Sequence, residues 1–180
     1  ANYYTYEDEV DNYGQDHQQL HLEHTLGDWR LSATGHFTHG EGYFEQYKAG
    51  DDLADYNLPE GVQGGDTVTS TDLVLRRWLD NDFYGGVLGA ERRWDRAALK
   101  LGGAWNRYAG APFGEVIWAR NASVAPGPSY RYYNGDGIKL DRNAFARFVQ
   151  RSNDGRLQAQ AELQYRGVRY RAAGTDNDQQ

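Results

Sequence analysis

A hairpin with one apolar and one polar face, which occurs three times along the chain, most restricts the possible folds. In the first hairpin the arms, 20–26 and 29–38, alternate between apolar and polar residues and are joined by Gly27 and Asp28. A two-residue turn pairs odd with even positions, which places the apolar residues of both arms on the same face. The pattern therefore predicts a sheet with one apolar and one polar face.

The second hairpin has the same design, with a turn at Asp95 and Arg96. In this register Glu91 lies directly opposite Lys100, and a pair of opposite charges on neighbouring strands stabilises a sheet. The apolar residues of its two arms again share one face.

The third hairpin is predicted to turn at Asp154 and Gly155, a dipeptide that favours a type I′ turn. This register places Arg147 opposite Glu162. A turn at Asn153-Asp154 keeps the same faces but loses that ion pair, so we prefer the first register. Three hairpins of one design indicate a single extended sheet.

These hairpins predict an all-β fold, an antiparallel up-and-down meander of about six long strands. The predicted strands cover roughly 12–26, 29–47, 72–94, 97–118, 138–153 and 156–172. Short turns join them at one end, and long loops at roughly 49–71 and 119–137 join them at the other. This asymmetry is typical of bacterial outer-membrane barrels, which have at least about eight strands. We therefore expect residues 1–180 to form part of a transmembrane β-barrel, as one partial barrel domain.

Composition excludes several other classes of protein. The net charge of −7 and the absence of a Lys/Arg run argue against a nucleic-acid partner. The chain has no cysteine, which excludes a disulfide framework, and no apolar stretch approaches the ~18 residues of a transmembrane helix. Trp29 and Trp94 lie beside two of the short turns on the apolar face, where the aromatic girdle of a membrane barrel is expected.

Five segments spread over the chain carry a further signal. They are DEVDNY at 8–13, GEGYFEQYK at 40–48, RWLDNDFYG at 77–85, YYNG at 132–135 followed by Lys139, Asp141 and Asn143, and LQYR at 163–166. In order and spacing these segments resemble the barrel of TonB-dependent outer-membrane receptors. In that family a barrel of many strands encloses an N-terminal plug, and an inner-membrane complex energises the uptake of scarce nutrients such as ferric chelates.

The resemblance implies that this chain is a mid-barrel portion of such a receptor, without the plug domain. It implies a location in the outer membrane of a Gram-negative bacterium. The implied partners are outer-membrane lipid, the remaining barrel strands and plug, a small-molecule or chelate ligand and, through the plug, the inner-membrane energising complex. Transport rather than catalysis is the expected role, and no cofactor is expected.

Aromatic residues and arginines gather near the predicted long loops. The candidates for ligand contact are Trp118, Arg120, Tyr130, Arg131, Tyr132 and Tyr133. Tyrosine and tryptophan offer rigid contact area with a polar handle, and arginine recognises carboxylate or chelate groups. Tyrosines within the strand ends are better explained as an aromatic girdle anchored in lipid headgroups. For residues 130–133 both interpretations stay open.

Three histidines, His17, His21 and His36, share the polar face and form a weak candidate for a transition-metal site. We favour the simpler interpretation that neutral histidines line a hydrated interior, because no second shell of carboxylates can be identified from the sequence. Paired carboxylates such as Asp80 and Asp82 have no spacing that separates them from solvated charges, so no catalytic residues are predicted.

Two other functions remain as alternatives to a receptor. One is a soluble, lectin-like β-sandwich that binds a ligand and whose apolar faces pack on each other. The other is an outer-membrane hydrolase that uses polar residues at the barrel rim. The position of the apolar stripes separates the first alternative from a barrel, because a sandwich covers them with a second layer of the same chain.

Overall fold

The structure, a computed structural model, describes residue 6 and residues 9–124, 127 and 130–175. The strands are β1 (Asp11–Leu26), β2 (Trp29–Asp52), β3 (Gly61–Gln63), β4 (Asp66–Val68), β5 (Ser70–Arg93), β6 (Ala97–Gly110), β7 (Phe113–Ala119), β8 (Arg131–Arg151) and β9 (Gln158–Thr175). Two short 3-10 helices are also formed, η1 (Leu53–Tyr56) and η2 (Ala122–Val124). No helix in the described part of the chain has the length and apolar content to cross a bilayer.

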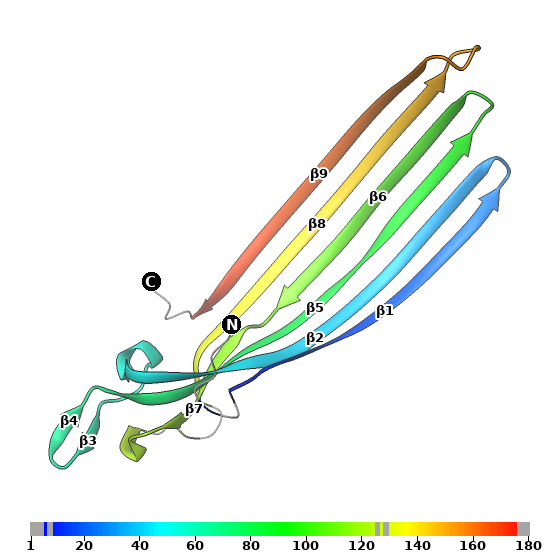
Figure 1. The fold of residues 1–180 in the computed structure, drawn as a ribbon. Coiled ribbons are helices and arrows are strands. Elements are labelled where there is room, and N and C mark those ends of the chain that lie inside the picture. Colours follow the sequence, from blue (N-terminus) through cyan, green and yellow to red (C-terminus); the bar gives the residue numbers. More distant parts are fainter. Residues whose placement is uncertain (1–5, 7–8, 125–126, 128–129, 176–180) are drawn as a thin grey trace.

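The long strands form one antiparallel sheet in the order β1-β2-β5-β6-β8-β9 (Figure 1). Strand β7 continues the path of β6 beyond Ala111 and Pro112, and pairs with β5 and β8. Pro112 has no N–H to donate to a ladder, which explains why the predicted strand 97–118 is interrupted there. The small hairpin β3–β4 projects beyond the sheet (Figure 1). The predicted all-β meander is confirmed.

All three predicted hairpin registers are confirmed. The pairs that define them are Leu26 with Trp29, Glu91 with Lys100, and Arg147 with Glu162. The alternation of apolar and polar residues fixed these registers, because a slip by one residue turns every side chain to the other face.

The type of the third turn was predicted wrongly. A type I′ turn at Asp154-Gly155 needs positive φ at both residues, but in this turn only Gly155 has it, at 69°. Ser152 instead accepts a hydrogen bond from the Gly155 N–H at 3.1 Å and donates its own N–H to Leu157 at 2.9 Å. The Asp154 carboxylate accepts from the Arg156 N–H at 3.1 Å, which stabilises this longer loop. The predicted register is kept because the loop closes on the pair Ser152 and Leu157, which belongs to that register.

Strand β8 begins earlier than predicted. Residues 131–137, which were assigned to the loop 119–137, belong to the strand. Glycines at 135 and 137 are typical of a loop. In the structure, however, Asn134 pairs with Thr175, and the Gly135 N–H donates a hydrogen bond to the Pro112 carbonyl oxygen at 2.8 Å. Pairing on both sides thus extends the ladder through a segment of weak intrinsic β-propensity. The loop 49–71 is shortened in the same way, since β2 runs to Asp52 and β5 starts at Ser70.

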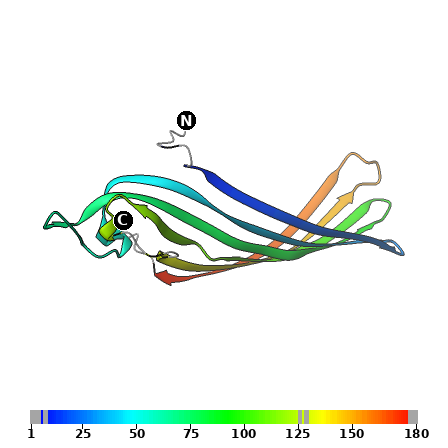
Figure 2. The same ribbon diagram turned by 90° about the horizontal axis from the view of Figure 1, so that it is seen from below.

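The sheet is a single curved layer whose apolar face is uncovered (Figure 2). Leu88 and Leu163 on this face are 66% and 77% exposed. The described residues form no second layer over it, so the sandwich architecture is not observed. In this part of the chain β1 and β9 each pair with one neighbour, which leaves both edges of the sheet open.

The apolar face carries a band, interrupted in β1 by His24, which we call the apolar belt. It comprises Leu20, Leu22 and Leu26 of β1, Trp29, Leu31, Ala33 and Phe37 of β2, Tyr84, Leu88 and Ala90 of β5 with Trp94, Leu99, Leu101 and Trp105 of β6, Ala144, Ala146 and Phe148 of β8, and Ala159, Ala161, Leu163 and Tyr165 of β9. On β2 the belt spans positions 29 to 37, followed on the same face by His39 and Glu41. That length of about nine residues matches a strand that crosses a bilayer.

The buried core lies at the other end of the sheet, on the polar face. It consists of Leu53, Tyr56, Leu58, Leu73, Leu75, Val116, Ala119, Val124 and Tyr132. Leu73 and Leu75 of β5 share the parity of Asn81 and Phe83, so η1 and the segments around it cover the polar face of the long-loop end. The loops are therefore folded onto the sheet.

Candidate functional site

The six predicted ligand contacts do not form one site, because they lie on opposite faces of the sheet. Tyr132 and Tyr133 lie on the polar face, with ring centroids 4.9 Å apart. Trp118 pairs with Val74 on the opposite face and is exposed. Arg131 also lies on that face, since its guanidinium stacks on Phe113. Tyr130 packs against the same core as Tyr132 and Tyr133, so the three tyrosines lie together on the polar face, apart from Trp118 and Arg131.

Tyr130 and Tyr132 fasten the loop 53–57 to the start of β8. The Tyr130 hydroxyl lies 2.8 Å from the carbonyl of Tyr56 and 2.7 Å from that of Asn57. Tyr132 is buried, with its ring 5.0 Å from that of Tyr56, and its hydroxyl accepts a hydrogen bond from Arg77. Burial raises the pKa of Tyr130. Both tyrosines therefore have a structural role in holding the loop.

A row of three aromatic rings crosses the long-loop end on the apolar face. Tyr43, Trp78 and Phe113 lie side by side on β2, β5 and β7, with centroids 4.6 and 5.6 Å apart. The Trp78 indole donates to Glu115 at 2.9 Å, and Arg131 covers Phe113 at 3.5 Å from the ring centroid. Sequence reasoning missed this row, although Trp78 has the same parity as the belt residues of its strand.

Arg120 is neutralised by a neighbouring carboxylate. It lies 2.6 Å from Asp72, which also accepts hydrogen bonds from the Tyr47 hydroxyl and, at 2.9 Å, from the Gly50 N–H. The hydrogen bond from Tyr47, the hydrogen bond from the Gly50 N–H and the charge of Arg120 together lower the pKa of Asp72. An arginine held in this way is less available for an anionic ligand than one without a partner.

The Asp72 cluster predicts a dependence of stability on pH. Because the pKa of Asp72 is lowered, its contribution is present above the ordinary carboxyl pKa and is lost as pH falls through the lowered value. Tyr47→Phe removes the largest cause and should raise the pKa of Asp72 towards its ordinary value. Carbon-detected NMR titration measures this directly. Arg120→Gln should raise the pKa of Asp72 by less, because the charge of the exposed Arg120 lowers this pKa less than the Tyr47 hydrogen bond does. An unchanged pKa of Asp72 in Tyr47→Phe would contradict this explanation.

The three histidines do not form a metal site. His17 and His21 each lie 3.0 Å from a threonine hydroxyl of β2, those of Thr38 and Thr34. His36 instead lies 2.9 Å from Asn106, on the other side of β5. Among the described residues there is no group of three metal-ligating side chains. The histidines instead link neighbouring strands on the polar face.

Gly85 allows His36 and Asn106 to meet across the backbone of β5. Gly85 pairs with both residues, and a Cβ built on it would lie 2.4 Å from the Asn106 side-chain oxygen and 2.2 Å from the Trp105 carbonyl oxygen. Such distances are far below van der Waals contact, so only glycine fits here without a shift of the backbone.

Gly85→Ala is expected to lower the free energy of unfolding by about 1–3 kcal/mol, because the added methyl group overpacks the polar face. Gly86→Ala is the matched control, since its Cβ would meet only the Thr34 carbonyl oxygen at 3.6 Å. Urea titration followed by tryptophan fluorescence compares the two variants. Equal losses in both would show that the side-chain contact over Gly85 is not the cause.

No protein-family model, curated protein or solved structure matches this chain. The arrangement itself offers two surfaces with different chemistry. The polar face carries histidine, amide and ion-pair groups such as Asp141–Arg166, at 2.6 Å, and the opposite face carries the apolar belt. The two faces of the sheet therefore differ in polarity.

Proposed function

We propose that this chain is part of the barrel wall of a TonB-dependent receptor in the outer membrane of a Gram-negative bacterium. The receptor takes up a scarce nutrient such as a ferric chelate. The observation that carries the proposal is the exposed apolar belt, about nine residues deep, on one face of a long antiparallel sheet. Water disfavours such a face, whereas the hydrocarbon of a bilayer accepts it.

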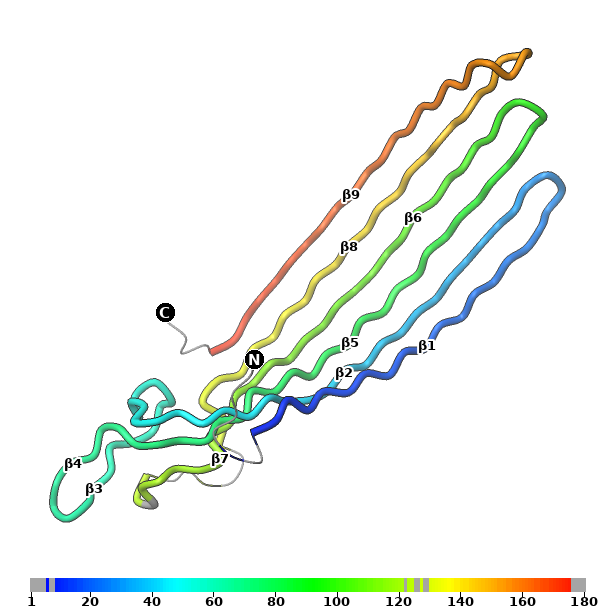
Figure 3. The backbone as a smooth tube through the Cα atoms, viewed as in Figure 1, coloured from blue at the N-terminus to red at the C-terminus, as the bar shows by residue number. Residues whose placement is uncertain are grey.

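The positions of the short turns support closure into a barrel. Along the strands, the second turn lies two residues beyond the first and the third lies three residues beyond the second (Figure 3). From the first turn to the third, the turns therefore advance by five residues of about 3.3 Å along the strands, while they cross four strand spacings of about 4.8 Å. The line through the turns is thus not perpendicular to the strands but deviates from the perpendicular by about 40°. In a barrel whose turns lie in one plane, this angle is the tilt of the strands from the barrel axis. Strands of closed barrels tilt by about 35–45°.

The other limit of the apolar belt slants in the same direction. At the long-loop end, the last belt residue of β5 is Tyr84, whereas the last belt residue of β8 is Ala144, and Arg142 follows Ala144 on the same face. Ala144 pairs with Gly103, which pairs with Leu88, so the limit has moved four residues towards the turns. A band whose limits are inclined to its strands is what a flat membrane imposes on a tilted barrel wall.

Arg92 supports a membrane interface at the short turns. Its guanidinium lies 5.9 Å from the ring of Trp29 and 5.0 Å from that of Trp94, and it pairs with Asp28 of the first turn at 2.9 Å. Tryptophan at an interface, with an arginine that extends its charge towards water, is the arrangement expected where a strand leaves the bilayer.

The open edges indicate the partners. In hydrocarbon an unpaired strand edge leaves backbone groups without hydrogen bonds, so β1 and β9 require the remaining barrel strands of the receptor. The polar face then faces the lumen, the plug and, through the plug, the inner-membrane energising complex. Of the predicted contacts, Tyr133 on the polar face is the one we retain as a candidate for the small-molecule or chelate ligand, since Tyr130 and Tyr132 hold the loop.

Fractionation and uptake together test this function. Cells that express the protein should carry it in the outer membrane and accumulate a radiolabelled ferric chelate, and accumulation should stop when the inner-membrane energising complex is deleted. Protein in the soluble fraction would contradict the barrel. Protein in the outer membrane with uptake that does not require the energising complex would contradict the receptor class alone.

The hydrolase and lectin-like alternatives have less support. The rim carboxylate Asp82 lies 2.9 Å from His39, but both side chains are partly exposed on the apolar-face side rather than in an enclosed pocket. A lectin-like sandwich needs a second layer that the described residues do not supply. We therefore retain the receptor as the proposal.

A further inference from the structure

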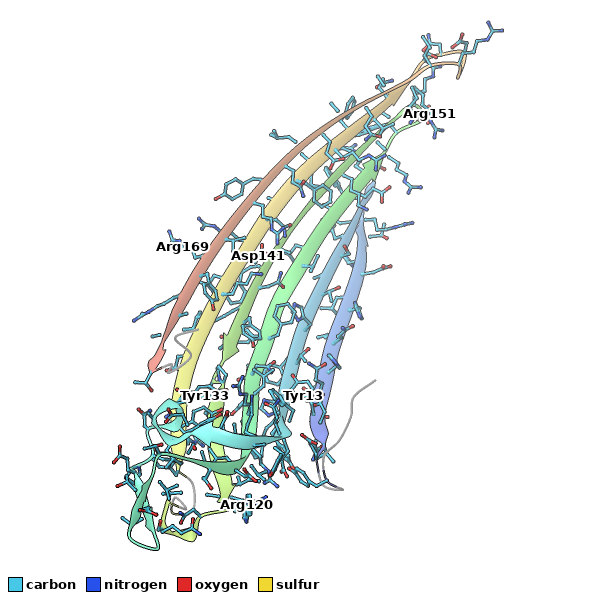
Figure 4. All side chains as sticks on the ribbon, turned by 60° about the vertical axis from the view of Figure 1, so that its left-hand side comes forward. Tyr13, Arg120, Tyr133, Asp141, Arg151 and Arg169 are labelled. Atoms are coloured by element: carbon cyan, nitrogen blue, oxygen red, sulfur yellow. The ribbon has the colours of Figure 1, made fainter. Side chains whose placement is uncertain are left out.

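Three arginines lie just beyond the apolar belt, on three neighbouring strands. Arg107 of β6, Arg142 of β8 and Arg169 of β9 share the face of the belt, because Leu140 pairs with both Arg107 and Arg169, and Arg142 pairs with Trp105. Figure 4 labels Arg169 on its strand. A small pocket beside Arg142 and Arg169 is also lined by Trp105, Leu140, Gly167 and Asp141, and the Asp141 carboxylate is paired with Arg166. The arginines therefore form one cluster at the long-loop limit of the belt.

This cluster is not neutralised by carboxylates of the described chain. Arg142 and Arg169 form no ion pair with a described residue, and the Arg107 guanidinium donates to the neutral hydroxyl of Tyr84. On the polar face of the same strands, by contrast, Arg166 is held by Asp141 at 2.6 Å. In a chain of net charge −7, a cluster of unpaired cations at one limit of the belt attracts an anion.

Below the cluster, β8 presents two small side chains on the belt, Ala144 and Ala146. Ala146 pairs with Leu101 of β6 and Leu163 of β9, and Ala144 pairs with Gly103 of β6 and Tyr165 of β9. Leu163 and Tyr165 are exposed and stand above the alanines. Strands on either side of β8 are about 10 Å apart, which leaves width for one acyl chain.

We infer that this surface binds an anionic lipid of the outer leaflet, one whose phosphate headgroup carries a net negative charge. Its phosphate lies between Arg142 and Arg169, whose planar guanidinium groups match phosphate oxygens, and an acyl chain lies along Ala144 and Ala146. The inference rests on the proposed function, since the belt must face lipid. It goes beyond that function by assigning a specific lipid class to one sector of the wall.

The opposite side of the same rim has the opposite charge. Glu41, Asp80 and Asp82 lie just beyond the belt on β2 and β5, and share its face. They would repel a lipid phosphate, so the selectivity is confined to the sector formed by β6, β8 and β9. Charge complementarity therefore fixes both the occupant and its place.

Quenching of tryptophan fluorescence by brominated lipids tests the inference, because Trp105 lies beside the cluster. The full-length protein is reconstituted into phosphatidylcholine vesicles that contain either brominated phosphatidic acid or brominated phosphatidylcholine. We expect phosphatidic acid to be preferred by roughly five-fold for each arginine engaged. Arg142→Gln with Arg169→Gln should abolish the preference. Arg147→Gln, on the polar face of the same strand, is the matched control and should keep it.

The outcomes separate this inference from the proposed function. Quenching by both lipids without a preference for phosphatidic acid would overturn the lipid site and leave the barrel wall intact. A preference that survives the double substitution, or that Arg147→Gln also removes, would overturn it as well. Absence of quenching by either lipid would contradict the membrane-facing belt itself, and with it the proposed function.

Discussion

Arginine in place of Ala33 is expected to lower the free energy of unfolding from lipid vesicles by about 2–4 kcal/mol. Ala33 lies at the middle of the belt on β2, between Leu31 and Phe37, where a charge would face the centre of the hydrocarbon. Urea unfolding of the protein in vesicles, followed by tryptophan fluorescence, measures the loss.

Thr34→Arg is the matched control, because Thr34 is the next residue and faces the opposite side of the sheet. Its arginine would extend into the hydrated lumen, and the expected cost is that of losing the hydrogen bond between Thr34 and His21, about 1 kcal/mol. If the two substitutions cost the same, the two faces do not meet different solvents, and the assignment of lipid to the apolar face fails.

Leu75→Ala is expected to destabilise the folded long-loop end by about 2–5 kcal/mol. Leu75 is fully buried among Leu53, Leu73 and Tyr132, so its removal leaves a cavity in a small core. The effect should be local, because the core lies at the long-loop end of β5 and β8, away from the belt residues of these strands. Hydrogen exchange of the segment 53–76 should accelerate, while exchange in β6 near Leu101 stays unchanged.

Val62→Ala provides the control for that substitution. Val62 lies in the hairpin β3–β4 and is 64% exposed, so its truncation should change stability by less than about 0.5 kcal/mol. Faster exchange spread evenly over all strands in Leu75→Ala would mean that the sheet and the folded loops unfold as one unit. That result would contradict a separate core.

The hairpins could be predicted because their information is local. Each register depends on the parity of alternating residues and on a short turn, and pairs such as Glu91–Lys100 confirm it within one hairpin. The turn type at Asp154 was less accessible, since the side-chain bond to Arg156 competes with the dipeptide preference. The strand register of a hairpin can therefore be predicted correctly even when its turn type is not.

The arrangement of the candidate site could not be predicted in the same way. Tyr132 and Tyr133 share the polar face although they are adjacent in the chain, because the register between β7 and β8 shifts between Gly114 and Glu115. A shift of this kind inverts the parity of every residue beyond it, and the sequence alone does not signal it. The core around Leu53 was missed for a related reason: apart from Leu73, Leu75 and Val116, its residues lie in segments assigned to loops, and loops carry no periodicity.

Single-cysteine labelling tests the central claim most directly, because the chain contains no cysteine of its own. Leu31, Ser32, Ala33 and Thr34 are each replaced by cysteine and exposed to a water-soluble maleimide in isolated outer membranes. We predict that Ser32→Cys and Thr34→Cys react, whereas Leu31→Cys and Ala33→Cys react only after the membrane is dissolved and the protein unfolded. Equal reactivity at all four positions, or the reverse alternation, would show that the apolar face of this sheet does not contact lipid.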